Sequence, residues 1–247
     1  MNLFIVTWSY DDHKDISETR LVKSFLKYNE KDKLHHLHFN RSNYKSLESE
    51  FESRFGYQFE FLLYRIFLLR QYLINLDIDN LVFSDTDDVV CMGKIDEFNS
   101  YLNDKVIFSS ESHQYPNEIN ITNWTPVNKY PDINKNSSQY LNAGLSFGEK
   151  DSYIKLFDFC IDEVMSQNYR NFGGDQGVFT YSLLNSDGEL LSLDQNNIFL
   201  NTYCLNYAGY YVDNNKLYKH GIEKPFLFVH DNGWNYGSPK FIEHFNL

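Results

Sequence analysis

Short apolar runs alternate along the chain with longer segments whose apolar residues recur at helical spacing. Runs of four to eight residues predict buried strands, and the 3.6-residue spacing predicts helices that cover them. We expect strands at residues 3–8, 34–39, 80–83, 106–109, 140–147, 198–201 and 226–229, the fifth of them containing an Asn-Ala-Gly turn. We expect helices at residues 17–28, 59–76, 152–165 and 176–184. This alternation, without a linker or an internal repeat, predicts one α/β domain over residues 1–247.

The most apolar stretch, residues 59–76, is apolar nearly all round and predicts a helix packed on both sides. It contains Glu60, Arg65 and Arg70, and charges at that density exclude a membrane span. Residues 112–139 are polar and carry several Pro and Asn, which predicts a long loop. His113, Tyr115 and Trp124 in it are candidate acceptor contacts, although Trp124 equally fits an aromatic side chain packed onto the core.

Net charge narrows the possible partners. The chain has 22 Lys and Arg against 34 Asp and Glu, a formal charge of −12. Such a chain repels phosphate backbones, which argues against broad nucleic-acid binding. A local basic face formed by Lys14, Arg20, Lys23 and Lys27 is the alternative by which the chain could still bind nucleic acid.

Cysteine usage and the N-terminal segment bear on the compartment. Cys91, Cys160 and Cys204 are far apart and odd in number, which favours reduced thiols over a disulfide framework. The opening residues lack a basic region followed by a long apolar one, so we expect no signal peptide. Together these features predict a cytoplasmic protein, in the host cytoplasm if the source is a virus or phage.

The strongest chemical feature follows the strand at residues 80–83. Asp85, Asp87 and Asp88 place three carboxylates within four residues. Such carboxylates repel one another unless a cation neutralises them, and hard ions such as Mn²⁺ or Mg²⁺ prefer oxygen ligands. The carboxyl end of a strand also faces the ligand crevice of an open α/β sheet. A solvated acidic turn is the competing interpretation.

Weaker features follow three other predicted elements. His230 ends the strand at 226–229 and offers a nitrogen ligand, or is simply hydrogen-bonded in a turn. Asp175 and Gln176 open a helix after two glycines, where Asp175 serves as a base, a nucleophile or a hydroxyl acceptor, or else as a helix cap. Asn142 either holds sugar hydroxyls or closes a turn.

A denser histidine motif lies near the N-terminus. His35, His36 and His38 occur within four residues. They fall in an apolar run, so a strand would place successive histidines on alternate faces. We expect no functional metal site there.

Seven segments carry a likeness to a known family. They are Val6-Thr7-Trp8, residues 85–88, Phe108-Ser109-Ser110-Glu111, Tyr140-Leu141-Asn142-Ala143-Gly144, Gly174-Asp175-Gln176, Ile198-Phe199-Leu200-Asn201 and Val229-His230-Asp231-Asn232-Gly233. Their order over residues 3–240 resembles metal-dependent GT-A glycosyltransferases, in particular the glycosyltransferase domain of procollagen lysyl hydroxylases and its viral relatives. The resemblance implies a Rossmann-like nucleotide-sugar-binding fold with a mixed, mostly parallel central sheet.

The resemblance also implies roles for individual residues. Asp85, Asp88 and His230 become the metal ligands; Asp87 replaces the Tyr usual in the family, so an Asp85–Asp87 pair stays an alternative. Contacts to the donor fall to Thr7, Trp8, Asp87, Glu111, Asn232 and Gly233. Asp175, Gln176 and Asn142 inherit catalytic positions. The family's phosphate-contacting Lys is missing before residue 59; Arg54 or Arg65 is the candidate substitute, and the alternative is that the metal alone neutralises the phosphate.

The function implied is transfer of a hexose from a UDP-sugar, with Mn²⁺ or Mg²⁺ as cofactor. UDP-glucose or UDP-galactose is the expected donor. The acceptor hydroxyl belongs to protein hydroxylysine, to a glycan or to a hydroxymethylated DNA base. Two other functions fit the residues: a non-catalytic sugar- or nucleotide-binding module, and a nucleotide-sugar hydrolase.

Overall fold

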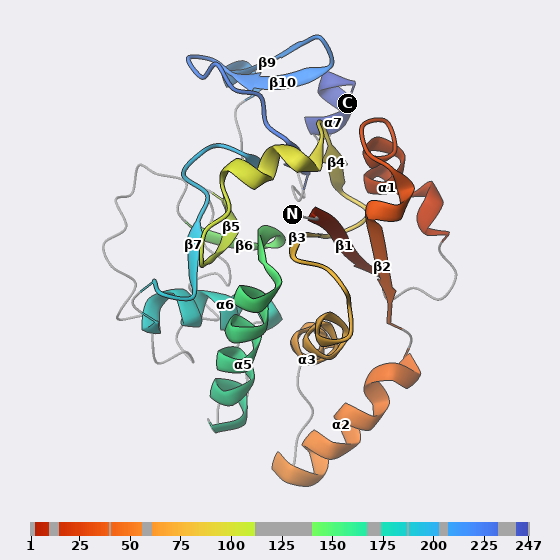
Figure 1. Cartoon of the computed structure of the whole chain (residues 1–247), viewed down its shortest axis with the longest axis vertical. Coiled ribbons are helices and arrows are strands. Elements are labelled where there is room, and N and C mark those ends of the chain that lie inside the picture. The colour runs from red at the N-terminus through yellow and green to blue at the C-terminus, as the bar shows by residue number, and fades with distance from the viewer. Residues whose placement is uncertain are drawn as a thin grey trace.

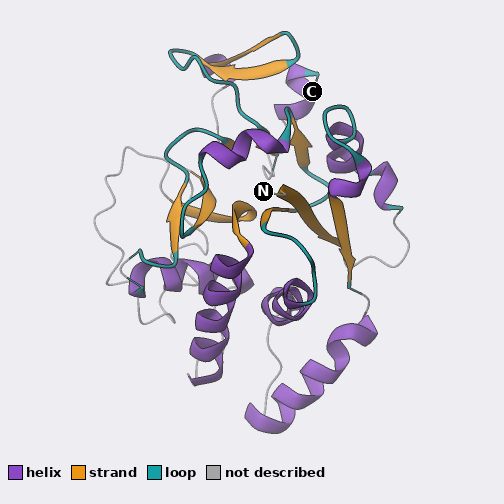
Figure 2. Ribbon diagram, in the orientation of Figure 1, coloured by secondary structure: helices purple, strands orange, loops and turns teal. Residues whose placement is uncertain are grey.

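The computed structural model describes most of the chain (Figures 1 and 2). The described residues are 3–9, 15–39, 41–55, 61–111, 140–166, 174–186, 188–202, 207–231 and 241–246. The predicted loop at 112–139, Lys14 and Cys204 lie outside these ranges. Cys91 and Cys160 are buried free thiols, as expected. No helix among the described residues is long and apolar enough to cross a membrane.

A six-stranded sheet forms the centre of the molecule, in the order β2-β1-β3-β6-β5-β7. Only β6 runs against the others, since β1 pairs in parallel with β2 and β3, and β5 in parallel with β7. The expected mixed, mostly parallel sheet is therefore confirmed. The strands are β1 (Leu3–Ser9), β2 (Leu34–His38), β3 (Asn80–Ser84), β5 (Val106–Glu111), β6 (Tyr140–Glu149) and β7 (Leu191–Leu193).

The central strands are buried on both faces, and alternate side chains enter different cores. Val6, Leu81 and Phe83 face one hydrophobic cluster, whereas Ile5 and Val82 face another. This is the two-residue period of a strand between two covering layers. The first cluster includes residues of α2, α3, α5 and α6, and the second includes residues of α1 and the 3₁₀ helix Ile95–Ser100.

The predicted helices lie where the apolar spacing places them, with three exceptions, one of which is the short helix Phe241–Phe245, which was not expected. The predicted helix at 17–28 is divided into the 3₁₀ helix Ile16–Glu18 and a shorter α-helix, because Thr19 has an extended backbone and caps the second one. An amphipathic helix before residue 56 was not expected. The α-helices are α1 (Arg20–Phe25), α2 (Arg41–Phe55), α3 (Phe61–Ile74), α5 (Lys150–Ser166), α6 (Gly174–Asn185) and α7 (Phe241–Phe245).

The turn expected within residues 140–147 is wrong, because β6 is one continuous strand. Its pairing with β5 is irregular instead. Phe108 lies opposite Ser146, but the next residue, Ser109, lies opposite Asn142. The three residues 143–145 are thus extra on β6, and the irregularity bends the strand beside the end of β3.

Two smaller sheets complete the fold (Figure 1). The first has the order β4-β11-β8, with β11 antiparallel to β4 and parallel to β8. The second is an antiparallel hairpin. Their strands are β4 (Val89–Cys91), β8 (Phe199–Asn201), β11 (Phe228–His230), β9 (Tyr210–Asp213) and β10 (Lys216–Lys219).

Candidate functional site

The acidic turn after β3 is fastened to two other strands of the central sheet. The backbone N–H of Asp85 donates to the carbonyl of Gly144 on β6 at 2.8 Å. The hydroxyl of Thr86 shares a hydrogen bond with the hydroxyl of Thr7 on β1 at 3.1 Å. These contacts hold the carboxylates at the carboxyl end of β3, where α/β sheets bind ligands.

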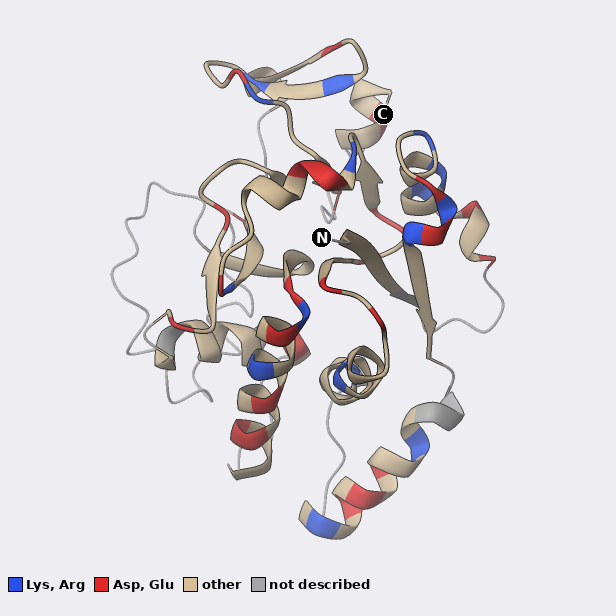
Figure 3. Cartoon of the chain, viewed as in Figure 1, with Lys and Arg blue, Asp and Glu red and all other residues tan. Residues whose placement is uncertain are grey.

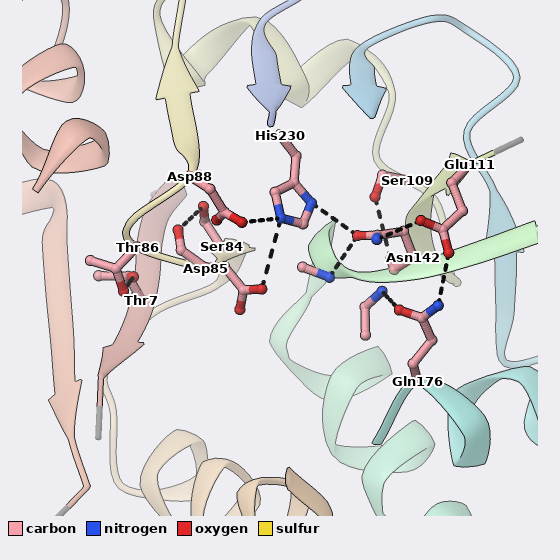
Figure 4. A network of polar contacts seen from close by, with 12 residues as sticks. Thr7, Ser84, Asp85, Thr86, Asp88, Ser109, Glu111, Asn142, Gln176 and His230 are labelled. Atoms are coloured by element: carbon pink, nitrogen blue, oxygen red, sulfur yellow. Dashed lines mark hydrogen bonds and ion pairs between the residues drawn. The ribbon is translucent and has the colours of Figure 1, made fainter. Parts of the chain in front are cut away.

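His230 reaches this turn from the opposite end of the sequence. β11 pairs with β4, which places His230 opposite Val89, the residue after the acidic turn. The backbone N–H of Asp231 also donates to the carbonyl of Asp88 at 2.7 Å. Strand pairing therefore brings the side chains of His230 and Asp88 together (Figure 4).

Asp85, Asp88 and His230 converge on one point. Nε2 of His230 lies 3.3 Å from Oδ2 of Asp88 and 4.0 Å from Oδ2 of Asp85. One ligand atom from each of the three residues lies within 4.8 Å of the others. The exposed Asp87 does not belong to this group. Of the two pairings that the sequence left open, the geometry thus brings Asp85 and Asp88 to His230.

The three side chains fit a divalent cation. Metal–ligand bonds are roughly 2–2.5 Å long, so ligand atoms around one ion lie up to about 5 Å apart. Two carboxylates and one imidazole combine hard oxygens with a borderline nitrogen, a set that suits Mn²⁺ better than the oxygen-preferring Mg²⁺. With three coordination positions filled by side chains, the remaining positions around the ion are open to oxygen atoms of a bound molecule.

A hydrogen bond on the other side of the ring orients His230. Nδ1 lies 3.1 Å from Oδ1 of Asn142. That amide oxygen also accepts from the N–H of Gly144, while Nδ2 of Asn142 donates to Glu111, so the amide orientation is defined by its partners. Nδ1 must then carry the proton that it donates, and Nε2 is left as the ligand atom facing the carboxylates.

The pKa of His230 reflects two opposing effects. Burial is the larger single effect and lowers the pKa, because it disfavours the charged ring. The nearby carboxylates of Asp88, Asp85 and Glu111 act in the other direction, and together they leave the pKa of His230 raised. The same negative charge that attracts a proton here attracts a metal cation.

Asn142, Glu111 and Gln176 form one polar network beside His230. The carboxylate of Glu111 accepts from Nδ2 of Asn142 at 3.0 Å and from Nε2 of Gln176 at 2.9 Å. Oε1 of Gln176 accepts from the backbone N–H of Ala143 at 3.2 Å. Glu111, a candidate donor contact, thus lies at the centre of a buried network that holds both amides in place.

Gly144 leaves the space that the cluster occupies. A Cβ atom built on it would lie 2.2 Å from Cε1 of His230 and 2.8 Å from Oδ2 of Asp85. Real carbon atoms do not approach so closely, so any larger residue would displace one of these two candidate ligands. The glycine in the segment Asn142-Ala143-Gly144 is therefore needed for close approach, not for the turn expected there.

Arg65 connects the acidic turn to Asp175. It projects from α3 and is only 4% exposed. Nη1 of Arg65 lies 3.0 Å from Oδ1 of Asp85, and Nη2 forms an ion pair with Oδ2 of Asp175. The other oxygen of Asp175 accepts from the N–H of Gln176 at 2.8 Å. From the sequence, Arg65 was predicted only as a candidate phosphate contact. Its position in an apolar helix could have indicated this role, because a charged side chain that is buried needs partners of opposite charge.

The remaining candidate donor residues are only partly described. The hydroxyl of Thr7 is fully buried against Thr86, so it braces the acidic turn. The backbone of Trp8 lies in β1, but its side chain is outside the described part of the chain. Asn232 and Gly233 are outside it as well.

The basic face considered around α1 is largely neutralised. Arg20 pairs with Glu243 at 3.3 Å, and Lys23 pairs with Glu18 at 2.6 Å. In Figure 3 the ribbon of this region alternates between basic and acidic residues. These pairs weaken the electrostatic case for a nucleic-acid partner.

Comparison with known proteins identifies the fold of the chain. No family model and no curated protein matches the sequence. Among solved structures, apo mouse xyloside xylosyltransferase 1 superimposes with a TM-score of 0.59 at 12% identity, over 97% of this chain and 100% of that one. An identity this low shows the fold alone. The chain has the GT-A-like fold of a glycosyltransferase, with a possible Asp-Asp-His metal group at the end of its third strand.

Proposed function

We propose that this chain is a metal-dependent glycosyltransferase that transfers a hexose from UDP-glucose or UDP-galactose to an acceptor hydroxyl. The observation that carries the proposal is the convergence of Asp85, Asp88 and His230 on a GT-A-like fold. Mn²⁺ is the proposed ion, and Mg²⁺ the substitute.

In the balanced reaction a bond forms from the acceptor oxygen to the anomeric carbon. The bond from that carbon to the diphosphate breaks, UDP leaves with the electron pair, and the hydroxyl proton is released to solvent.

The metal would be held by Asp85, Asp88 and Nε2 of His230. Bound there, it would neutralise the diphosphate and so improve the leaving group. Asn142 supports this site through the ring of His230. In known metal proteins, such supporting contacts change metal affinity about 10- to 100-fold.

Asp175 is proposed as the carboxylate nearest the sugar. Both of its oxygens already accept hydrogen bonds, from Arg65 and from the N–H of Gln176. A carboxylate engaged in this way suits orientation of the sugar or stabilisation of developing positive charge better than removal of a proton. This assignment favours a retaining reaction, in which Asp175 orients the sugar or stabilises positive charge, over an inverting one, in which it would be the general base.

The deciding experiment is isothermal titration of UDP with and without Mn²⁺. We expect binding by the wild-type chain to require Mn²⁺, and the Asp85→Asn, Asp88→Asn double variant to lose at least 100-fold in affinity. Asp87→Asn discriminates between the two carboxylate pairs, and we expect it to retain binding. Binding that ignores the metal would favour the non-catalytic module.

Turnover separates the transferase from a hydrolase. Release of UDP from UDP-glucose and UDP-galactose is measured with and without candidate acceptors. A transferase releases UDP faster when the acceptor is present and forms a glycosylated product. Release that no acceptor accelerates, with free hexose as the product, supports a nucleotide-sugar hydrolase instead.

A further inference from the structure

Glu111 is the junction at which the hydrogen bonds beside the metal group converge (Figure 4). Its two oxygens accept separately, Oε2 from Nδ2 of Asn142 at 3.0 Å and Oε1 from Nε2 of Gln176 at 2.9 Å. The amide oxygens of these two residues accept in turn from the backbone N–H groups of Gly144 and Ala143. Glu111 ends β5, whereas its two partners belong to β6 and α6, so the junction joins three elements.

The direction of these bonds follows from their backbone donors. A backbone N–H can only donate, so the side-chain atoms that face Gly144 and Ala143 must be the amide oxygens. The amide nitrogens of Asn142 and Gln176 then face Glu111, and each of them needs an acceptor there. An ionised carboxylate accepts at both oxygens. A glutamine at this position would offer one oxygen and one NH₂ group, so one of the two bonds would become a contact between two donors.

The two backbone donors belong to the irregular segment of β6. Residues 143–145 have no partner on β5, and the N–H groups of the first two find acceptors in side chains instead. The same segment carries Gly144, whose missing side chain leaves room for His230 and Asp85. The carbonyl of Gly144 also receives the N–H of Asp85 at 2.8 Å. Through its two amides, Glu111 therefore holds the backbone against which two candidate metal ligands pack.

The same series of bonds continues from Asn142 to His230. Oδ1 of Asn142 lies 3.1 Å from Nδ1 of the ring, so Nδ1 carries the proton and Nε2 is left as a ligand atom. If the amide were reversed, its NH₂ group would face Nδ1, and the proton would lie on Nε2. A protonated Nε2 cannot bind a metal. The direction imposed at Glu111 thus reaches the atom proposed to hold the ion.

We propose that Glu111 is a positioning residue that acts through two amides. Through Asn142 it sets the metal-binding tautomer of His230, and through Gln176 it holds the β6 backbone beside the metal group. This role replaces the direct donor contact expected of Glu111 from the sequence. Its support is that each oxygen is already used by an amide, in a residue that is only 5% exposed. The inference rests on the proposed function, because it concerns the metal site of that reaction.

Two paired substitutions test the proposal, because they move the negative charge and keep every bond between a donor and an acceptor. Glu111→Gln alone sets two donors against each other. In Glu111→Gln with Asn142→Asp, the new amide donates to the new aspartate and accepts from Gln176. In Glu111→Gln with Gln176→Glu, it donates to the new glutamate and accepts from Asn142. The charge lies beside His230 in the first pair and across the junction from it in the second.

Two measurements follow the effect on His230 in the full chain. NMR of ¹⁵N-labelled histidine in the metal-free protein, at alkaline pH where the ring is neutral, identifies the nitrogen that carries the proton. Isothermal titration gives the affinity for Mn²⁺ alone. The control is Asp194→Asn, the same change at a carboxylate that three backbone N–H groups hold outside the junction.

We expect the proton on Nδ1 of His230 in the wild type and in Asp194→Asn, with Mn²⁺ affinities within about threefold of each other. Glu111→Gln should populate the Nε2-protonated form and bind Mn²⁺ about 10- to 100-fold more weakly. Both double variants should restore the Nδ1 proton and at least about a third of the wild-type affinity.

The inference is overturned if Glu111→Gln keeps the tautomer and the affinity of the wild type. It is also overturned if only the pair with the charge beside His230 recovers, since proximity of the charge would then explain the effect. If Glu111→Gln alone is too unstable to study, the double variants decide. Both should then fold with the proton on Nδ1, and failure of either contradicts the proposal.

Titration of UDP on the same proteins separates this inference from the proposed function. Mn²⁺-dependent UDP binding, together with an unchanged tautomer in Glu111→Gln, would overturn the inference and leave the transferase standing. A chain that binds neither Mn²⁺ nor UDP, but in which the tautomer of His230 changes and recovers as expected, would do the reverse.

Discussion

Two histidine-bearing strands, β2 and β11, differ in what surrounds their rings. β2 carries His35, His36 and His38, whereas β11 carries only His230. The rings of His36 and His38 lie 6.3 Å apart, and His35 packs edge-on against Phe4 at 5.0 Å. Among the described residues, the group close enough to share one ion is the one around His230. Histidine density along the sequence therefore does not locate the candidate metal site.

The pKa values express the same contrast. Burial lowers the pKa of His35, and burial with repulsion from His38 lowers the pKa of His36 to about 4. Burial acts in the same direction on His230, but the surrounding carboxylates outweigh it. A buried histidine becomes attractive to a cation when carboxylates from other elements converge on it.

The largest expected effect comes from removing the cation that balances these carboxylates. Arg65→Met leaves Asp85 and Asp175 without their shared partner, and we expect it to lower the free energy of unfolding by about 3–5 kcal/mol. Arg70→Met, on the same helix, breaks a partly exposed pair with Asp158 and should cost less than about 1 kcal/mol. Urea denaturation measures both. Equal losses of unfolding free energy would show that the buried ion pairs of Arg65 stabilise the fold no more than the exposed pair of Arg70.

The contrast between the strands is tested directly by matched histidine substitutions. His230→Ala should weaken Mn²⁺ binding about 100-fold or more, because it removes a proposed ligand. His36→Ala removes no proposed ligand, so it should change the Mn²⁺ affinity less than about threefold. Isothermal titration of Mn²⁺ gives both values. Comparable losses in the two variants would mean that β2 also binds the ion.

A methyl group beside His230 should sharpen the comparison further. Gly144→Ala forces His230 or Asp85 to move, and overpacking of this kind costs about 1–3 kcal/mol of stability. Weaker Mn²⁺ binding should accompany it. Gly209→Ala is the matched control, since its Cβ would meet nothing within 4 Å. Thermal unfolding and metal titration of both variants measure the effects, and an unaltered Gly144→Ala protein would contradict the close approach.

The smallest effect is on pH dependence. The folded-state pKa of His36, about 4, lies below the ordinary histidine value of 6.5, so the unfolded chain binds this proton first as pH falls. The resulting stability is present above pH 6.5 and is lost as pH falls toward 4. His36→Gln should flatten that slope by up to one proton.

The NMR titration of the metal-free protein should show His230 titrating above 6.5; a lower midpoint would contradict the role of the carboxylates.

Much of the fold follows from local pattern, and the exceptions are instructive. The apolar run at residues 80–83 is a buried strand because its side chains alternate between two cores. The turn expected near Asn142 was wrong, since an irregular pairing with β5 takes up the extra residues inside one strand. That irregularity depends on the partner strand, which the local sequence does not contain.

The sequence by itself determined that carboxylates follow a buried strand, that a histidine ends another, and that a charge lies in an apolar helix. These are local properties, because backbone periodicity decides which side chains are buried and where an element ends. The tertiary structure decided that Asp88 rather than Asp87 faces His230, and that Arg65 joins Asp85 to Asp175. Those outcomes depend on the pairing of strands far apart in the chain, such as β4 with β11, which brings together groups that no local pattern relates.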